Sequence, residues 1–340
     1  MEKRRIIVLG AGITGLTAAY EALKLAKREN VSLHVTVWEA SSRAGGKVRT
    51  EHKAGVDCEV GPDSFLTNKP QAIDLIRELG LESELLRTDP ARKTVSVFMG
   101  GSLRPLPEGL MLVLPSRILP FALCDLLSWK AKLRMALEPF IAAGPRGGDE
   151  SLASFFRRRL GSEAVEKLVA PMLAGIYASD AEQMSLKSTF PQFLEMERRG
   201  GLLVGLRRRP KQAAETGDIS LFMTLKGGLC RLTDSLAAKL PAGTLQYGQA
   251  VRSLSRRGGV WMAATDKGVF EADSVISALP ANVLAPLVGD LDAELSAALG
   301  EIPFSSTATV SLAYDAKSFS GRVEGFGFLV PKGQDCRITA

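Results

Sequence analysis

A glycine-rich turn near the start of the chain is the feature that constrains the fold most. Gly10, Gly12 and Gly15 form a G-x-G-x-x-G motif that follows the apolar run 6–9 and opens a helical pattern. Such glycines allow a tight turn, close approach of the backbone to a pyrophosphate, and close packing of helix on strand. The alternating run 33–39 predicts a second strand, so we expect a βαβ unit that binds phosphate at its helix N-terminus.

The acid at the end of the second predicted strand indicates a dinucleotide. Glu39 stands where a carboxylate would accept hydrogen bonds from ribose hydroxyls, and it would repel the 2′-phosphate of NADP. The following run, EASSRAGGKVRT, adds a second glycine pair with flanking cations. This composition favours a long anionic ligand such as FAD over NAD, with an ordinary solvated turn as the alternative.

Charge and cysteine content narrow the class of protein. The chain has 340 residues, a length typical of about two domains, and a net charge of +6. The cations are scattered without interleaved aromatic residues, which argues against nucleic-acid binding. The four cysteines lie far apart, so we expect a reducing, cytoplasmic environment with neither a disulfide framework nor a metal site. We identify no catalytic side chain.

An apolar segment over residues 109–142 leaves two alternatives open. Proline and charged residues interrupt it, so it is too short to span a membrane as a helix. Its apolar residues are interspersed with Arg117, Lys130, Lys132 and Arg134. The segment would suit packing within a helical domain or peripheral contact with the inner face of the membrane.

Four segments are predicted along the chain. Residues 1–65 hold the βαβ unit and 66–205 are mainly helical, while the Gly- and Arg-rich run 198–218 is predicted to be an exposed connection. Residues 206–285 contain short strands separated by glycine turns, typical of a meander that leads into another parallel strand. Residues 286–340 continue as strands and stop without a closing helix, so we expect a chain that is cut short.

Longer stretches carry a resemblance to a known family. GAGITGL followed by EASSRAGGKVRT resembles the FAD-binding half of the flavin amine oxidase and protoporphyrinogen oxidase superfamily. Later stretches, CEVGPDSFL, LVAPMLAGIYASD, LKGGLCRLTDSLA and ADSVISALPA, are similar to the bacterial porphyrinogen oxidases of haem synthesis, Gram-positive type. The resemblance covers essentially the whole chain, although family members continue past its end with a segment that closes over the flavin.

The resemblance implies an α/β fold of the amine-oxidase type. Residues 1–65 and 206–285 would form an FAD-binding, Rossmann-like domain. Residues 66–205 would form a helical insert that faces substrate or membrane, and 286–340 would add strands to a mixed-sheet substrate domain.

The resemblance also implies an activity. The expected reaction is oxidation of coproporphyrinogen III, or of protoporphyrinogen IX, to the porphyrin, with FAD as cofactor and O2 as acceptor, giving hydrogen peroxide. The alternatives are an amine oxidase, an enzyme similar to carotenoid desaturases, and an inactive truncated protein of the same fold.

Site residues follow from the positions that match the family motifs. In the glycine turn Gly10, Gly12, Thr14 and Gly15 would hold the pyrophosphate, and Glu39 the adenosine ribose. The residues expected to line the pyrophosphate, the ribityl chain, the flavin and the adenine are Arg43, Gly45, Gly46, Lys47, Gly61, Pro62, Asp63, Ser64 and Val251.

Four further residues are expected to meet the tetrapyrrole substrate. Lys69 and Arg87 are cations suited to pairing with propionates. Ile176 and Tyr177 lie in a motif that matches the macrocycle-facing wall of the family. The alternatives are solvated cations and residues packed at the end of a helix.

Overall fold

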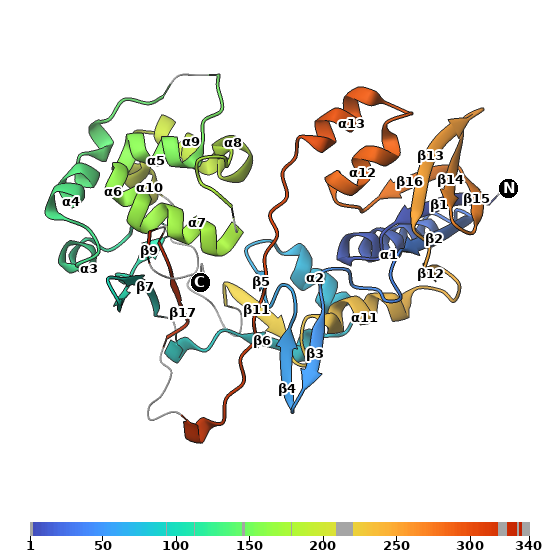
Figure 1. Cartoon of the computed structure of the whole chain (residues 1–340), viewed down its shortest axis with the longest axis horizontal. Coiled ribbons are helices and arrows are strands. Elements are labelled where there is room, and N and C mark those ends of the chain that lie inside the picture. Colours follow the sequence, from blue (N-terminus) through green and yellow to red (C-terminus); the bar gives the residue numbers. More distant parts are fainter. Residues whose placement is uncertain are drawn as a thin grey trace. The chain divides into compact units, whose positions relative to one another are not determined.

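The computed structural model describes residues 3–92, 94–111, 113–144, 147–177, 179–208, 220–318, 325–331 and 333–334. The chain forms two compact units, labelled by element in Figure 1. Unit 1 comprises Met1–Thr88, Gly217–Phe304 and Ala308–Ala313. Unit 2 comprises Asp89–Thr216, Ser305–Thr307 and Tyr314–Ala340. The division into four segments stays a prediction.

A four-stranded parallel sheet forms the centre of unit 1. Its order is β12 (Leu245–Tyr247), β2 (Leu33–Glu39), β1 (Arg4–Leu9) and β16 (Ser274–Ser277). Strand β1 therefore pairs on one side with its neighbour in sequence and on the other with a strand from the far end of unit 1. The βαβ unit predicted from the glycine turn is present.

Both faces of β1 are covered. Val8 packs in one apolar cluster with Leu16 of α1 (Ile13–Arg28) and Leu236 of α11 (Cys230–Lys239). Ile7 and Leu9 point into a second cluster on the opposite face. That face is covered by an antiparallel meander, β13 (Val251–Arg257), β14 (Val260–Thr265) and β15 (Gly268–Ala272), as expected from the glycine turns. Helices α12 (Ala281–Val288) and α13 (Ala293–Gly300) follow β16.

The remaining elements of unit 1 are short. A hairpin joins β3 (Thr50–Lys53) and β4 (Val56–Glu59), and a small sheet has the order β5 (Phe65–Leu66), β11 (Phe222–Leu225), β6 (Leu85–Arg87). Helix α2 (Gln71–Glu78) is followed by Gly80, which has φ +78°, and the 3-10 turn η1 spans Glu82–Glu84.

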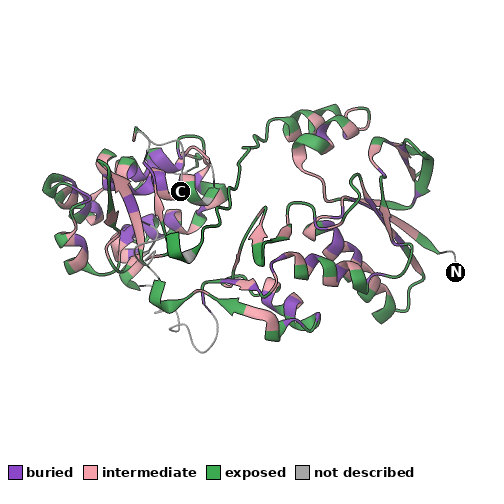
Figure 2. Ribbon diagram, turned by 60° about the horizontal axis from the view of Figure 1, so that its bottom comes forward, coloured by how far each residue is buried: buried purple, intermediate pink, exposed green. Residues whose placement is uncertain are grey.

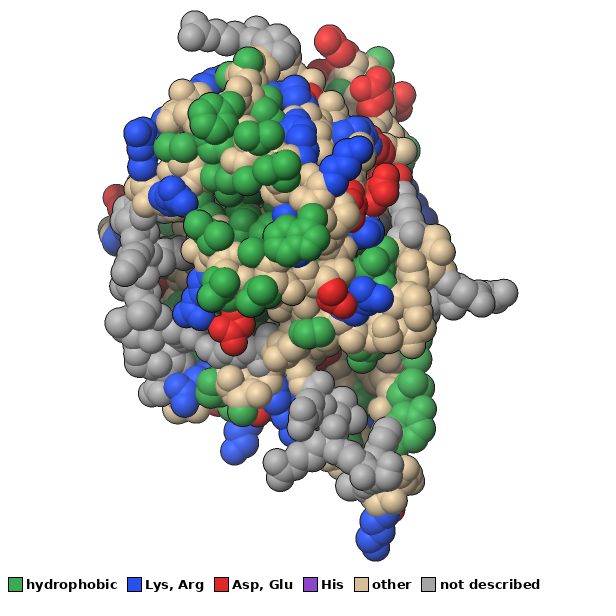
Figure 3. All heavy atoms as spheres, turned by 90° about the vertical axis from the view of Figure 1, so that its left-hand side faces the viewer, with side chains coloured by type: hydrophobic (Ala, Val, Ile, Leu, Met, Phe, Trp, Pro, Cys, Tyr) green, Lys and Arg blue, Asp and Glu red, His purple; other side chains and the backbone are tan. Residues whose placement is uncertain are grey.

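Unit 2 is mainly helical around an aromatic core. Phe155, Phe156 and Phe193 pack together in its interior, where buried residues gather in Figure 2. Its helices are α3 (Ile118–Leu123), α4 (Trp129–Ala136), η3 (Glu138–Phe140), α5 (Leu152–Leu160), α6 (Ser162–Ala164), η4 (Val165–Val169, a π-helix), α7 (Ala170–Tyr177), α8 (Leu186–Thr189), α9 (Pro191–Arg198) and α10 (Leu202–Arg208). Figure 3 shows exposed apolar side chains on one face of this unit.

Strands also occur in unit 2. The strands are β7 (Val95–Met99), β8 (Ser102–Pro105), β17 (Gly327–Leu329), β9 (Leu110–Met111) and β10 (Leu114–Pro115), with 3-10 turns η2 (Pro90–Arg92) and η5 (Ala316–Ser318). The strands within residues 66–205 lie where the sequence predicted mainly helix, whereas β17 lies within residues 286–340, where strands were expected. Strands this short leave little periodic pattern to detect. No helix among the described residues is both long and apolar enough to cross a bilayer.

The segment 198–218 was expected to be an exposed connection, and this expectation is wrong for its first part. Residues 202–208 form α10, and Leu202 and Gly205 are buried; residues 209–219 lie outside the described residues. The reason is a carboxylate distant in sequence. Glu138 accepts hydrogen bonds from the N–H groups of Leu202 (2.8 Å) and Leu203 (3.1 Å), which satisfies the start of the helix.

Glu138 is also half of a buried ion pair. The guanidinium of Arg159, 1% exposed, donates from Nε to Oε1 of Glu138 at 2.7 Å and from Nη1 to the carbonyl of Ile141 at 2.7 Å. A charge in this position is tolerated because its partner and its hydrogen bonds are both present. The pair joins η3, α5 and α10.

We expect Arg159→Met to lower the free energy of unfolding of unit 2 by about 3–5 kcal/mol, because it leaves a buried carboxylate without its cation. Arg157→Met is the matched control, since Arg157 pairs with Glu182 on the surface of the same helix and should contribute within about 1 kcal/mol. Urea unfolding monitored by circular dichroism and Trp129 fluorescence measures both. Equal losses in the two variants would contradict the role given to the buried pair.

Candidate dinucleotide site

The glycine turn adopts a geometry that other residues would not fit. Gly10 has φ +93°, and a Cβ on Gly15 would lie 1.9 Å from the carbonyl oxygen of Gly10. Helix α1 begins beyond Gly12 with no side-chain cap and no acid in its first turn. Its first N–H groups and the positive end of its dipole are therefore available to an anion.

The second glycine loop lies directly against the first. The N–H of Gly45 donates to the carbonyl of Ala11 at 2.8 Å, and a Cβ on Gly46, which has φ +58°, would lie 3.0 Å from Cα of Gly12. The two loops thus present bare backbone side by side. Such a cradle suits a pyrophosphate, which needs close approach of the main chain.

The Glu39 carboxylate is fixed between these loops. Its Oε2 accepts from the N–H of Ala11 and its Oε1 from the N–H of Ser41, each at 2.9 Å. Burial alone would raise the pKa of Glu39, but the two N–H groups, with the Ser41 hydroxyl and Arg43, outweigh burial and lower it. Glu39 is therefore an ionised acceptor at neutral pH, as a ribose-binding acid must be.

The cations of the second loop are placed differently from one another. Arg43 donates from Nη2 to the carbonyl of Gly46 (2.6 Å) and from Nη1 to that of Ala44 (3.0 Å), so its guanidinium braces its own loop. The ammonium of Lys47 lies 5.9 Å from the ring centroid of Phe304. Arg43 thus stabilises the conformation of this loop.

The segment predicted to lie beside the flavin contacts the second loop. A Cβ on Gly61 would lie 2.0 Å from the carbonyl oxygen of Lys47, so the backbones meet there. Pro62 follows, and the Ser64 hydroxyl donates to Asp63 at 2.8 Å.

The residues just before Val251 contact Glu39. Val251 opens β13, and the N–H of Gln249 donates to the carbonyl of Glu39 at 2.9 Å. Gln249 could not be identified from the sequence, because its contact with Glu39 depends on tertiary structure. Its side chain is 7% exposed, and its Oε1 is the buried side-chain acceptor without a hydrogen-bond partner among the described residues. A buried unsatisfied acceptor of this kind fits a ligand that supplies a donor.

The residues predicted to contact a substrate lie partly in unit 1 and partly in unit 2. Lys69, before α2, and Arg87, on β6, are exposed in unit 1. Tyr177 ends α7 in unit 2, 44% exposed, with its ring edge-on to Phe190 at 5.9 Å between centroids. The side chain of Ile176 lies outside the described residues. Their substrate roles stay predictions.

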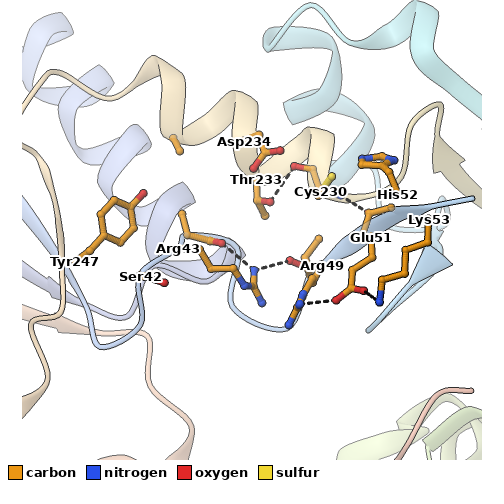
Figure 4. Close-up of a pocket in the computed structure, with 14 residues that line it drawn as sticks. Ser42, Arg43, Arg49, Glu51, His52, Lys53, Cys230, Thr233, Asp234 and Tyr247 are labelled. Carbon is orange, nitrogen blue, oxygen red and sulfur yellow. Dashed lines mark hydrogen bonds and ion pairs between the residues drawn. The ribbon is translucent and has the colours of Figure 1, made fainter. Parts of the chain in front are cut away.

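An open pocket of about 800 Å³ lies on unit 1 between the loop 42–44, β3 and α11 (Figure 4). Three of its charged groups are paired with each other: Arg49 and Lys53 both contact the carboxylate of Glu51. His52 pairs with Asp57 at 2.7 Å. The described residues contain no cluster of three or more metal-ligating side chains.

The parallel sheet with its glycine turn is an α/β fold with a candidate dinucleotide site. The chain belongs to the flavin containing amine oxidoreductases, whose family model matches residues 13–335. It is an oxidoreductase, and its cofactor is a flavin.

Individual relatives agree with this family. Coproporphyrinogen III oxidase of Bacillus subtilis is 37% identical over 99% of this chain and 72% of the relative. Human protoporphyrinogen oxidase is 34% identical over 98% of this chain and 71% of the relative. A crystal structure from Exiguobacterium sp. 255-15 superimposes with a TM-score of 0.81 at 30% identity, over 100% of this chain and 72% of the other. The predicted fold class and family are confirmed.

The lowered pKa of Glu39 predicts a pH-dependent contribution to stability. Because the folded-state value lies below the ordinary 4.5, the contribution is fully present above pH 4.5 and is lost as pH falls through the folded-state pKa. Glu39→Gln should therefore destabilise unit 1 at neutral pH, and its difference from the original chain should shrink in acid. Thermal unfolding monitored by Trp38 measures this; Glu301→Gln, an exposed acid, is the control. A difference independent of pH would contradict the prediction.

Proposed function

We propose that this chain oxidises a porphyrinogen to the porphyrin in haem biosynthesis, with FAD as cofactor and O2 as electron acceptor. The observation that carries the proposal is the 37% identity with a coproporphyrinogen III oxidase across 99% of the chain. Three further observations support it: the uncapped helix, the two-glycine-loop cradle and the ionised Glu39. Coproporphyrinogen III is the preferred substrate and protoporphyrinogen IX the second candidate.

The cofactor-binding roles fall on backbone groups. The first N–H groups of α1, including that of Thr14, hold the pyrophosphate with Gly10, Gly12 and Gly15. Glu39 accepts from the ribose hydroxyls, and Gln249 and Val251 meet the adenine side. The bound flavin supplies the two-electron oxidation chemistry.

The same proposal extends to the residues of the second loop and the flavin-side segment. Arg43 shapes the loop while Gly45, Gly46 and Lys47 line the pyrophosphate and ribityl chain. Gly61, Pro62, Asp63 and Ser64 lie beside the ring.

The reaction balances as three successive two-electron oxidations. Porphyrinogen loses six electrons and six protons, and three molecules of O2 accept them to give three of hydrogen peroxide. The reaction requires neither a protein nucleophile nor a metal ligand, because the flavin supplies the oxidation chemistry. The protein binds and orients the macrocycle.

Recognition of the substrate has two parts. Lys69 and Arg87 attract propionate carboxylates in unit 1. The half-exposed ring of Tyr177 offers apolar contact to a flat macrocycle in unit 2. The same role is proposed for Ile176 from its place in the motif alone. The three described cysteines are free, which suits the cytoplasm.

Flavin retention tests the cradle. Gly46→Ala should abolish flavin retention, because the new Cβ would lie 3.0 Å from Cα of Gly12, where the phosphate approaches. Gly55→Ala is the matched control: Gly55 also has positive φ, +77°, but nothing lies within 4 Å of its Cβ position. Flavin absorbance after gel filtration is the measurement. Equal flavin loss in both variants would show that backbone strain, and not a clash in the cradle, causes the loss. That result would contradict the role given to the cradle.

Porphyrin fluorescence in air with added FAD tests the substrate. Coproporphyrinogen III should be oxidised faster than protoporphyrinogen IX, and Lys69→Gln should raise KM several-fold with little change in kcat, since Lys69 acts in binding. Lys226→Gln is an exposed-cation control. Amine-dependent peroxide production without porphyrinogen turnover would favour an amine oxidase instead. A flavin-bound chain with neither activity would overturn the proposal.

A further inference from the structure

Helix α11 begins without a cap of its own. Its N-cap residue, Leu229, supplies no side-chain acceptor, and its first turn contains no acid. The acceptors come from the β3–β4 hairpin. Oε1 of Glu59, 170 positions earlier in the chain, accepts from the N–H of Leu229 at 2.7 Å. Oγ1 of Thr50 accepts from the N–H of Cys230 at 3.2 Å. A carboxylate at this end of a helix also stabilises it by facing the positive end of its dipole.

Glu59 and Thr50 form one hydrogen-bonded pair. They lie opposite each other in the hairpin, and the hydroxyl of Thr50 donates to Oε2 of Glu59 at 2.8 Å. Each carboxylate oxygen therefore has a donor, one from the hairpin and one from α11. Without this carboxylate, the N–H of Leu229, a residue only 5% exposed, would lose its acceptor.

A glycine turn allows the hairpin and the helix to approach this closely. Gly228 has φ +91°, and a Cβ at this position would lie 2.3 Å from Oγ1 and Cγ2 of Thr50. The second glycine of the LKGGLCRLTDSLA stretch is therefore required by the contact between α11 and β3.

Helix α11 also packs against the second glycine loop. Thr233 is 1% exposed, and its hydroxyl donates to the carbonyl of Cys230 at 3.0 Å (Figure 4). A Cβ on Gly45 would lie 3.1 Å from Oγ1 of Thr233. The same helix thus contacts the candidate pyrophosphate loop and, one turn earlier, holds the hairpin.

The hairpin leads directly into the segment predicted to lie beside the flavin, residues 61–64. Glu59 ends β4 two positions before Gly61, and a Cβ on Gly61 would lie 2.0 Å from the carbonyl oxygen of Lys47. Thr50 begins β3 three positions after Lys47. The Glu59–Thr50 pair therefore lies just beyond the point where the backbones of the two segments meet.

We propose that Glu59 is a positioning residue for the flavin. By holding the β3–β4 hairpin to the start of α11, it keeps residues 61–64 in place against the second glycine loop. Glu59 acts through the backbone of this segment, and this inference rests on the proposed place of residues 61–64 beside the flavin ring. The adenosine and pyrophosphate contacts do not need Glu59, because Glu39 holds the two glycine loops.

A comparison of FAD with ADP tests this role in the full chain freed of flavin. ADP has the adenosine and pyrophosphate of FAD but no flavin ring, so its binding reports the cradle and the folding of unit 1. In calorimetric titrations, Glu59→Ala should weaken FAD binding about tenfold or more, because the segment must then be ordered on binding. Its affinity for ADP should stay that of the original chain. Glu59→Gln should be intermediate, since its amide oxygen can still accept from Leu229.

Glu51→Ala is the matched control. Glu51 lies in the same hairpin, but its carboxylate contacts Arg49 and Lys53, its near neighbours in sequence (Figure 4). This variant should bind FAD and ADP like the original chain. The inference is overturned if Glu59→Ala weakens FAD and ADP equally, or if it affects FAD no more than Glu51→Ala does; either result leaves the proposed function standing.

A different result would contradict the proposed site itself. If the original chain binds FAD no more tightly than ADP, residues 61–64 contribute nothing to binding of the ring. The proposed place of this segment would then fail, and the role of Glu59 with it.

Discussion

Glu39 connects the glycine turn, the second glycine loop and the segment before β13. One oxygen holds the glycine turn at Ala11, the other holds the second loop at Ser41, and the carbonyl of the same residue receives the N–H of Gln249. These bonds hold the two glycine loops beside each other. Because the acid is already fixed and ionised in the protein, ligand binding needs little local reorganisation.

Most groups that face the candidate cofactor belong to the main chain. The requirements on sequence therefore fall on a few positions where a side chain would collide, such as Gly15 and Gly46, and on Glu39. Other positions around the site are free to vary as long as the strands and helices keep their packing.

The elements that could be predicted from the sequence are those that local residue patterns determine. The glycine turn, its flanking strands and the meander all have short-range signals, and they form as expected. Gln249 and the buried start of α10 could not be predicted, because each depends on a partner far along the chain, Glu39 and Glu138 respectively. The apolar segment 109–142 was compatible with both packing in a helical domain and peripheral membrane contact for a similar reason. Composition alone does not show that the side chain of Phe121 is buried while that of Leu123 is exposed. The substrate roles of Lys69 and Tyr177 stay predictions.

The pairing of β1 with β16 has a consequence for synthesis of the chain. Arg5 and Asp273, which meet beside these strands, are 268 positions apart, so one edge of the first strand waits for its partner until the ribosome has made the rest of unit 1. At about 5–20 residues per second this interval is on the order of tens of seconds. An apolar strand with an open edge is a site for wrong pairing. The sheet that carries the glycine turn is thus completed on one edge only after β16 has been made, although β1 and β2 can pair early.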